Sequence, residues 1–160
     1  MFKIGDYIAH PMHGAGVIES IVTKKINGAQ RDYYVLKLPV GDMVVMVPVV
    51  GCEDIGVRAI ISRSEAENVF DAFNELEISM TQNWNKRYRE NMDKIKSGNL
   101  LDVAAVVKGL MCRDNERGLS TGERKMLHSA KQILISELVV ATDMDYDGVE
   151  RRLCSALKEE

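Results

Sequence analysis

The 160-residue sequence has few residues that could carry covalent or metal chemistry. Its three cysteines, Cys52, Cys112 and Cys154, are far apart and form no C-x-x-C pair, which argues against a disulfide framework and a zinc site. Gly14-Ala15-Gly16 is too short for a phosphate-binding loop, and no Ser/His/Asp or Cys/His arrangement can be argued. We therefore expect no enzyme activity, no metal and no cofactor.

Two short patterns resemble metal sites but are incomplete. His10 and His13 share a loop, yet no nearby carboxylate or thiol completes a ligand set, so a role in the turn is the commoner explanation. The run Asp143-Met144-Asp145-Tyr146-Asp147-Gly148 matches the first half of a calcium loop. Its twelfth position is Cys154, where a bidentate glutamate is needed, so we interpret the run as a polar loop before the last helix.

Long apolar runs are also absent. No stretch could span a bilayer, and the N-terminal Met-Phe-Lys-Ile-Gly-Asp lacks the apolar core of a signal peptide. We expect a cytoplasmic protein with no membrane segment. With 46% apolar and 28% charged residues, the chain can form one large domain or two small ones.

The hydrophobic pattern divides the chain near residue 61. Residues 1–61 contain short apolar runs separated by turn signals, of which Asn27-Gly28 is the strongest and Gly41-Asp42 is a second. This pattern predicts a small antiparallel β-barrel of the Tudor or SH3 kind. Residues 62–160 have helical periodicity and predict an all-α domain, so the fold class is α+β.

Start and stop signals place the helices. Ser64 and Ser120 each begin a capping-box pattern, and Asn83 can cap a helix that starts beside it. Gly98 and Gly118 are positioned to end the second and third helices.

Charge is unevenly distributed behind a net value of −3. Residues 64–83 hold five acids and no cation, whereas residues 84–131 hold eleven cations against six acids, leaving +5. A basic middle favours contact with phosphates, although a solvated helical face gives the same count.

The only tryptophan, Trp84, lies at the start of the second predicted helix, beside Lys86, Arg87 and Arg89. An indole among cations suits a nucleic acid, because cations take phosphates and the ring can stack on a base or wedge beside it. On spacing alone, a buried stripe with Tyr88 is the commoner explanation.

The pair Lys24-Lys25 lies beside the Asn27-Gly28 turn. A hairpin edge there could accept a strand from another protein, or could be an ordinary exposed hairpin.

Several spaced motifs resemble the CarD family (also called CdnL) of bacterial RNA polymerase-binding regulators. The resemblance is colinear over nearly the whole chain and weakens after about residue 142. It rests on Phe2-Lys3-Ile4-Gly5-Asp6, His10-Pro11-Met12-His13-Gly14, Asn83-Trp84-Asn85-Lys86-Arg87-Tyr88, Arg113-Asp114-Asn115-Glu116-Arg117-Gly118-Leu119-Ser120 and Gly122-Glu123-Arg124-Lys125-Met126-Leu127.

The resemblance implies a Tudor-like module that binds the RNA polymerase β subunit and a helical module that binds promoter DNA with little base reading. It implies that Trp84 wedges into the minor groove at the upstream edge of the transcription bubble and stabilises the open complex. The implied DNA-binding residues are Trp84, Lys86, Arg87, Arg89, Arg124 and Lys125. The implied polymerase-binding positions are Lys24, Ile26 and Met46, and Met46 stands where well-known members carry an arginine.

Two other functions stay open. The chain could be a scaffold that binds only proteins, with a buried Trp84 and no DNA contact, or a calcium- or metal-using enzyme. Salt-dependent binding to forked promoter DNA in the presence of polymerase separates the regulator from the scaffold.

Overall fold

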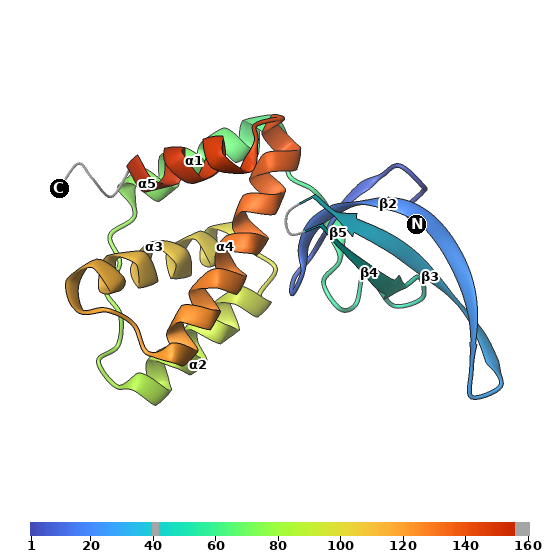
Figure 1. Cartoon of the computed structure of the whole chain (residues 1–160), viewed down its shortest axis with the longest axis horizontal. Helices are drawn as coiled ribbons and strands as arrows, with labels where there is room; N and C mark the ends of the chain where they lie inside the picture. The colour runs from blue at the N-terminus through green and yellow to red at the C-terminus, as the bar shows by residue number, and fades with distance from the viewer. Residues whose placement is uncertain (40–41, 156–160) are drawn as a thin grey trace.

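The computed structural model describes residues 1–39 and 42–155. Within these ranges an antiparallel sheet precedes five helices, which confirms the predicted α+β fold (Figure 1). Gly41 of the predicted second turn and residues 156–160 of the predicted helical domain lie outside the described residues. None of the helices in the described ranges is long and apolar enough to cross a bilayer.

The sheet has five strands in the order β4-β3-β2-β1-β5. It is open, which corrects the expectation of a barrel, because within the described residues the edge strands β4 and β5 are not paired with each other and β5 has only two residues. The strands are β1 (Tyr7–His10), β2 (Gly14–Ile26), β3 (Ala29–Leu38), β4 (Met43–Pro48) and β5 (Arg58–Ala59).

Strands β2 and β3 form a long hairpin that extends away from the helices (Figure 1). Its turn is Asn27-Gly28, as predicted, and both residues have positive φ, 52° and 80°. On β2, strand β1 pairs with residues 14–17. Within the described ranges, the outer half of β2 therefore has a hydrogen-bonded neighbour, β3, on one side only.

The helices are α1 (Arg63–Glu75), α2 (Trp84–Lys96), α3 (Leu100–Arg117), α4 (Thr121–Thr142) and α5 (Tyr146–Ser155). Asn83 caps α2 and Ser120 caps α4, as predicted. The first cap was misplaced by two residues. The capping box is formed by Ser62 and Glu65, which can reach each other's backbone N–H groups, rather than by Ser64.

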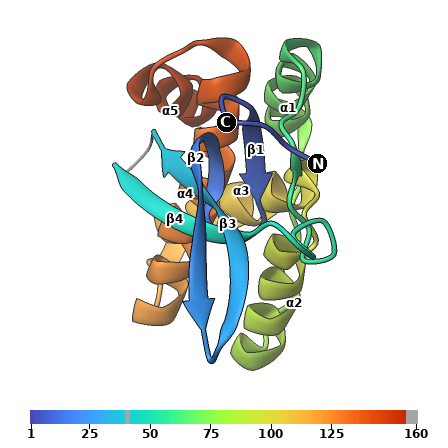
Figure 2. The same cartoon turned by 90° about the vertical axis from the view of Figure 1, so that its right-hand side faces the viewer.

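Two separate groups of buried side chains stabilise the chain. The first lies within the sheet around Ile8, Ile18, Tyr34 and Leu36. The second lies among the helices and contains buried residues from all five of them. Helix α4 packs against β2, and a view from the sheet side shows the helices behind the strands (Figure 2).

Candidate nucleic-acid interface and sheet surface

Trp84 is the first residue of α2, and 43% of its surface is exposed. Its ring stacks on Tyr88 with the centroids 5.1 Å apart and an interplanar angle of 20°. The exposure of the apolar stripe predicted for this helix therefore falls along its length. Trp84 at the first residue of the helix is partly exposed, whereas Ile95 near its last residue is 3% exposed. A buried Trp84, which the scaffold alternative required, does not fit this arrangement.

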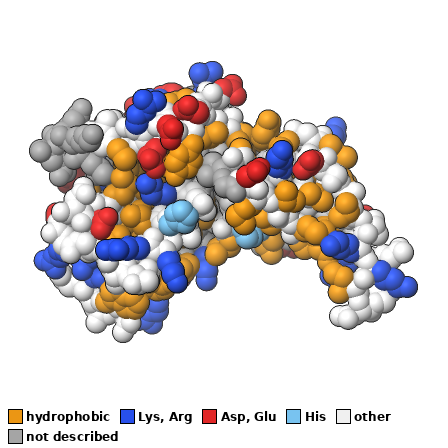
Figure 3. Space-filling model, in the orientation of Figure 1, with side chains coloured by type: hydrophobic (Ala, Val, Ile, Leu, Met, Phe, Trp, Pro, Cys, Tyr) orange, Lys and Arg blue, Asp and Glu red, His pale blue; other side chains and the backbone are white. Residues whose placement is uncertain are grey.

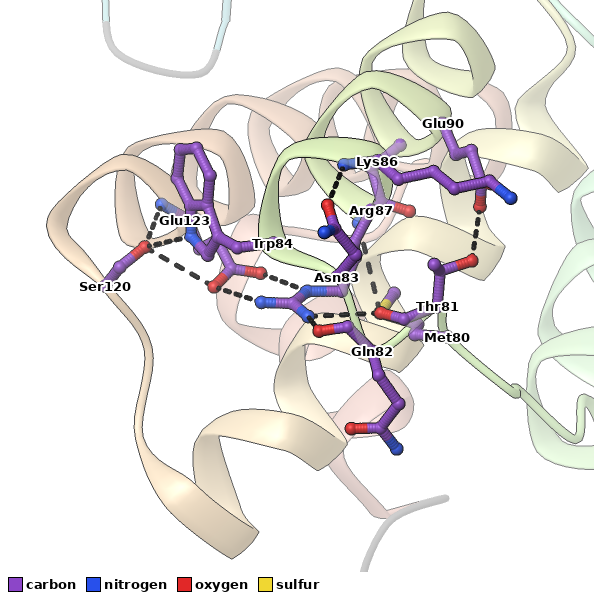
Figure 4. Close-up of polar contacts among 11 residues, drawn as sticks. Met80, Thr81, Gln82, Asn83, Trp84, Lys86, Arg87, Glu90, Ser120 and Glu123 are labelled. Atoms are coloured by element: carbon purple, nitrogen blue, oxygen red, sulfur yellow. Dashed lines mark hydrogen bonds and ion pairs between the residues drawn. The ribbon is translucent and has the colours of Figure 1, made fainter.

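The indole is fixed to the start of a second helix. Its Nε1–H donates to Ser120 Oγ at 3.1 Å, and Ser120 is the N-cap of α4 (Figure 4). Gly122 lies under the ring, since a Cβ on that glycine would be 3.5 Å from Trp84 Cζ2. Two helix N-termini thus meet at one aromatic ring, and each contributes a positive partial charge there.

Arg87 is buried between the same two helix starts, at 2% exposure. Its Nε and NH2 groups donate to the Glu123 carboxylate at 2.9 and 3.2 Å. Its NH1 group donates to the carbonyls of Thr81 and Gln82 at 3.1 and 3.0 Å (Figure 4). This corrects the placement of Arg87 among the DNA-facing cations, because the side chain is buried and four of its five N–H groups already donate inside the protein.

The surroundings of Glu123 favour its charged form. Burial alone would raise its pKa, but the hydrogen bonds from Arg87 and the charges of Arg87 and Arg113 outweigh burial. The pKa of the Glu123 carboxyl is therefore lowered, and the ion pair persists at neutral pH.

The other four predicted DNA-binding cations, Lys86, Arg89, Arg124 and Lys125, are exposed. At about 100° per residue, Lys86 and Arg89 project from the side of α2 roughly opposite Trp84. They therefore lie on the far side of α2 from the indole rather than around it. Cationic side chains gather over this end of the helices, and acidic side chains gather along the opposite edge near α5 (Figure 3).

The predicted polymerase-binding residues Lys24, Ile26 and Met46 lie on one face of the sheet. They pair across to Arg31, Ala29 and Val35 of β3, and alternate residues of a strand share a face. The opposite face of β3 carries the buried Tyr34, Leu36 and Leu38.

This outer face, defined by Lys24, Ile26, Arg31, Val44 and Met46, carries exposed apolar side chains on both sides of its two cations. Ile26 is 47%, Val44 58% and Met46 37% exposed. Val44 shares the face because it pairs with Lys37. The apolar residues have no partner on the outer side among the described parts of the chain, so the surface suits a protein partner.

Sequence reasoning missed several residues of both surfaces. Ser120 and Gly122 were identified only as parts of a helix start, and nothing in their spacing showed that Trp84 lies against them. Val44 could have been found, because two apolar sets alternate along Met43–Pro48, and only one of them can face the core.

No group of three or more His, Cys, Asp or Glu in the described ranges could hold a metal ion. In the incomplete calcium pattern, Asp145 Oδ1 accepts from Gly148 N–H at 2.7 Å, so this side chain supports the start of α5. A pocket of about 600 Å³ lies between residues 58–61, α1 and the start of α3, and none of the residues around Trp84 lines it.

Comparison with known proteins gave matches over both parts of the chain. Residues 2–61 match the family model described as the CarD-like/TRCF RID domain, and residues 68–154 match the CarD C-terminal domain. The chain is 38% identical over 140 residues to a Bacillus subtilis (strain 168) protein named "Putative transcription factor YdeB". The alignment covers 88% of this chain and 92% of that protein.

Proposed function

This chain belongs to the CarD family of transcription factors, and we propose that it binds RNA polymerase through its sheet and promoter DNA through the Trp84 end of its helices. Its role is that of a transcription regulator. We assign the polymerase-binding module to residues 1–61 and the DNA-binding module to the helices from residue 62. The proposal places the protein in the cytoplasm, beside the polymerase, and includes no catalytic step.

The observation that carries the proposal is an exposed indole held in a fixed position between two helix starts. Because Tyr88, Ser120 and Gly122 already hold the ring in place, it loses little conformational entropy when it is inserted beside a base pair. Wedging normally costs a few kcal/mol per unstacked step, and part of that cost is absent where the strands have already separated. The indole therefore prefers the upstream fork of a melted promoter to closed duplex.

The exposed cations suit this task. Lys86 and Arg89 on the far side of α2 from the indole, and Arg124 and Lys125 on α4, can contact the DNA backbone near the wedge. Such contacts position the protein and carry little base information. A ligand that prefers the open state shifts the promoter equilibrium by its differential affinity alone, so no energy source is needed.

On the polymerase side, we propose that the outer face of the sheet contacts the β subunit through Lys24, Ile26 and Met46, together with Val44 and Arg31. The exposed apolar side chains of this face supply the buried area and its cations supply orientation. Binding there raises the effective concentration of the Trp84 site at promoter DNA.

The test is the lifetime of the open promoter complex with polymerase, with and without the protein. We expect the wild type to lengthen the lifetime, and Trp84→Ala and Lys24→Glu each to abolish the increase while remaining folded. Trp84→Phe is the matched control, because it keeps a smaller stacking ring. If Trp84→Ala lengthens the lifetime as the wild type does, the wedge proposal is wrong. A wild type that binds polymerase but not forked DNA would favour the protein-only scaffold.

A further inference from the structure

The sheet and the helices have separate buried clusters, which share no residue. Apolar side chains from both sides, among them Ala9 and Ile133, line a narrow space at the seam between them. The directional contacts across this seam are an ion pair, hydrogen bonds and a close backbone approach. A seam of this kind gives a defined geometry, because ion pairs and hydrogen bonds are directional whereas apolar contacts are not.

Glu137 of α4 is the centre of the seam and is 1% exposed. Its carboxylate accepts two bonds from the Arg58 guanidinium, NH1 to Oε2 at 2.6 Å and NH2 to Oε1 at 2.9 Å. It also accepts the backbone N–H of Ile61 at 2.9 Å. The same Arg58 donates its Nε–H to the carbonyl of Gly98 at 3.2 Å.

These bonds join four parts of the chain: strand β5, the segment that leads to α1, helix α4 and the turn between α2 and α3. The Glu137 bond to Arg58 raises the pKa of the guanidinium, so Arg58 stays charged over the whole physiological range. We name Arg58 and Glu137 together the seam pair.

A second contact lies one residue away along α4. Ser136 Oγ accepts the N–H of Ala15 at 2.9 Å, and a Cβ on Gly14 would overlap that oxygen and lie 3.2 Å from Ile133 Cα. Gly14 has a φ of 91°, which disfavours other residues. The start of β2 is therefore pressed directly against the α4 backbone.

Helix α4 connects this seam to the Trp84 site. Glu137 is 17 residues from Ser120, the N-cap that holds the indole, which corresponds to about 25 Å along the helix. A rotation of α4 by about 10° at the seam would displace the indole by about 4 Å, because the indole is about 25 Å away. That displacement is about the spacing of one base pair along DNA.

We propose that Arg58 and Glu137 are positioning residues that set the angle between the polymerase-binding sheet and the DNA wedge. This inference rests on the proposed function for its consequence but not for its geometry. Two linked sites reinforce each other only when one geometry satisfies both, and the benefit is lost when the angle varies. The seam pair thus converts two modest contacts into joint binding at one promoter position.

The experiment compares the wild type with Arg58→Met and with Arg152→Met. The second variant is the matched control, because Arg152 forms a two-bond pair with Glu67 that joins α5 to α1 and does not cross the seam. Backbone residual dipolar couplings report the angle without polymerase or DNA. We expect one alignment tensor to fit the sheet and the helices of the wild type and of Arg152→Met, and two tensors to be needed for Arg58→Met.

The functional arms measure polymerase binding, binding to forked DNA alone, and open-complex lifetime. For Arg58→Met we expect the first two to stay near the wild-type values and the lifetime increase to fall about tenfold. A single tensor for Arg58→Met, or two tensors with an unchanged lifetime, would overturn the proposal. If Arg58→Met does not fold, the double variant Arg58→Met/Glu137→Leu, which leaves no buried charge unpaired, decides by the same measurements.

The two proposals fail in different ways. A wild type that does not lengthen the open complex disproves the proposed function, while the dipolar couplings still decide whether the seam pair sets the angle.

Discussion

Arg87 of α2 and Glu123 of α4 form a buried ion pair one helical turn behind the bond between Trp84 and Ser120. Arg87 follows Trp84 by three residues, and Glu123 follows Ser120 by three residues, so the two pairs lie one behind the other. The hydrogen bond between Trp84 and Ser120 fixes the exposed ring, and the buried ion pair of Arg87 and Glu123 holds the starts of α2 and α4 together.

Replacement of Arg87 by methionine is expected to lower the free energy of unfolding by about 3–5 kcal/mol, because it leaves the Glu123 charge buried without its partner. The double variant Arg87→Met/Glu123→Leu is expected to recover much of that loss, since no buried charge remains. Urea unfolding followed by far-UV circular dichroism measures both. Equal losses for the single and double variants would show that the pair does not act as a unit.

The same pair predicts a pH dependence. The pKa of Glu123 is lowered from its usual 4.5 in the folded state, so its contribution to stability is complete above about pH 4.5 and is lost as the pH falls through the folded-state pKa. Glu123→Gln should therefore be less stable than the wild type at pH 7, and the difference should narrow below pH 4.5. Unfolding curves at pH 7 and at decreasing pH test this expectation, and a constant difference would contradict it.

Four exposed cations on α2 and α4 predict the salt dependence of DNA binding. Each of Lys86, Arg89, Arg124 and Lys125 that contacts a phosphate adds about 0.9 to the negative slope of log K against log salt. Arg89→Gln should reduce the slope by about that amount with little change in stability. Lys24→Gln, which removes the same charge from the sheet, is the control and should leave the slope unchanged. Fluorescence anisotropy with forked DNA at several salt concentrations gives the slopes.

Gly122 gives a graded test of ring position. Alanine should fit, since its Cβ would lie 3.5 Å from Trp84, and replacing a helical glycine should stabilise the fold by up to about 1 kcal/mol. Leucine has no such space and should displace the indole from Ser120, changing tryptophan fluorescence and weakening forked-DNA binding. If Gly122→Leu binds forked DNA as tightly as the wild type does, the position of the Trp84 ring against Gly122 and Ser120 is not important for binding.

His10 offers a prediction outside the DNA site. Burial and the neighbouring His13, whose ring centroid is 4.5 Å away, lower the His10 pKa from 6.5 to about 4. Because the unfolded chain binds the proton more readily, stability should fall from pH 6.5 to pH 4 and stay constant above that range as far as His10 is concerned. His10→Gln should reduce the change in the free energy of unfolding between pH 6.5 and pH 4. NMR titration of the imidazole protons should show His10 neutral at pH 6. Titration near pH 6.5 would contradict the prediction.

Local signals predicted much of the secondary structure. The Asn27-Gly28 turn, the caps at Asn83 and Ser120 and the helix stop at Gly118 are all found where the sequence placed them, because each depends on a few neighbouring residues. The cap of α1 was misplaced because Ser62 and Ser64 each begin a Ser-x-x-Glu pattern, with Glu65 and Glu67, and the helix uses the first of the two.

The role of Arg87 could not be obtained in this way. A cation three residues after an exposed ring has the same sequence pattern whether it faces a phosphate or a carboxylate of another helix. The carboxylate is Glu123, 36 residues further along the chain, and only the crossing of α2 and α4 brings the two together. The closing of the sheet was equally undetermined, because strand count and turns do not fix whether the two edge strands meet.

The sequence by itself determined the α+β layout, the turn and cap positions and the family, because these follow from short-range chemistry and colinear motifs. Tertiary structure alone decided which cations face solvent, that Lys24, Ile26 and Met46 share one face, and that Arg58 meets Glu137 across the seam. Those relations depend on contacts between residues far apart in the chain, and no local pattern encodes the angle at which two packed units meet.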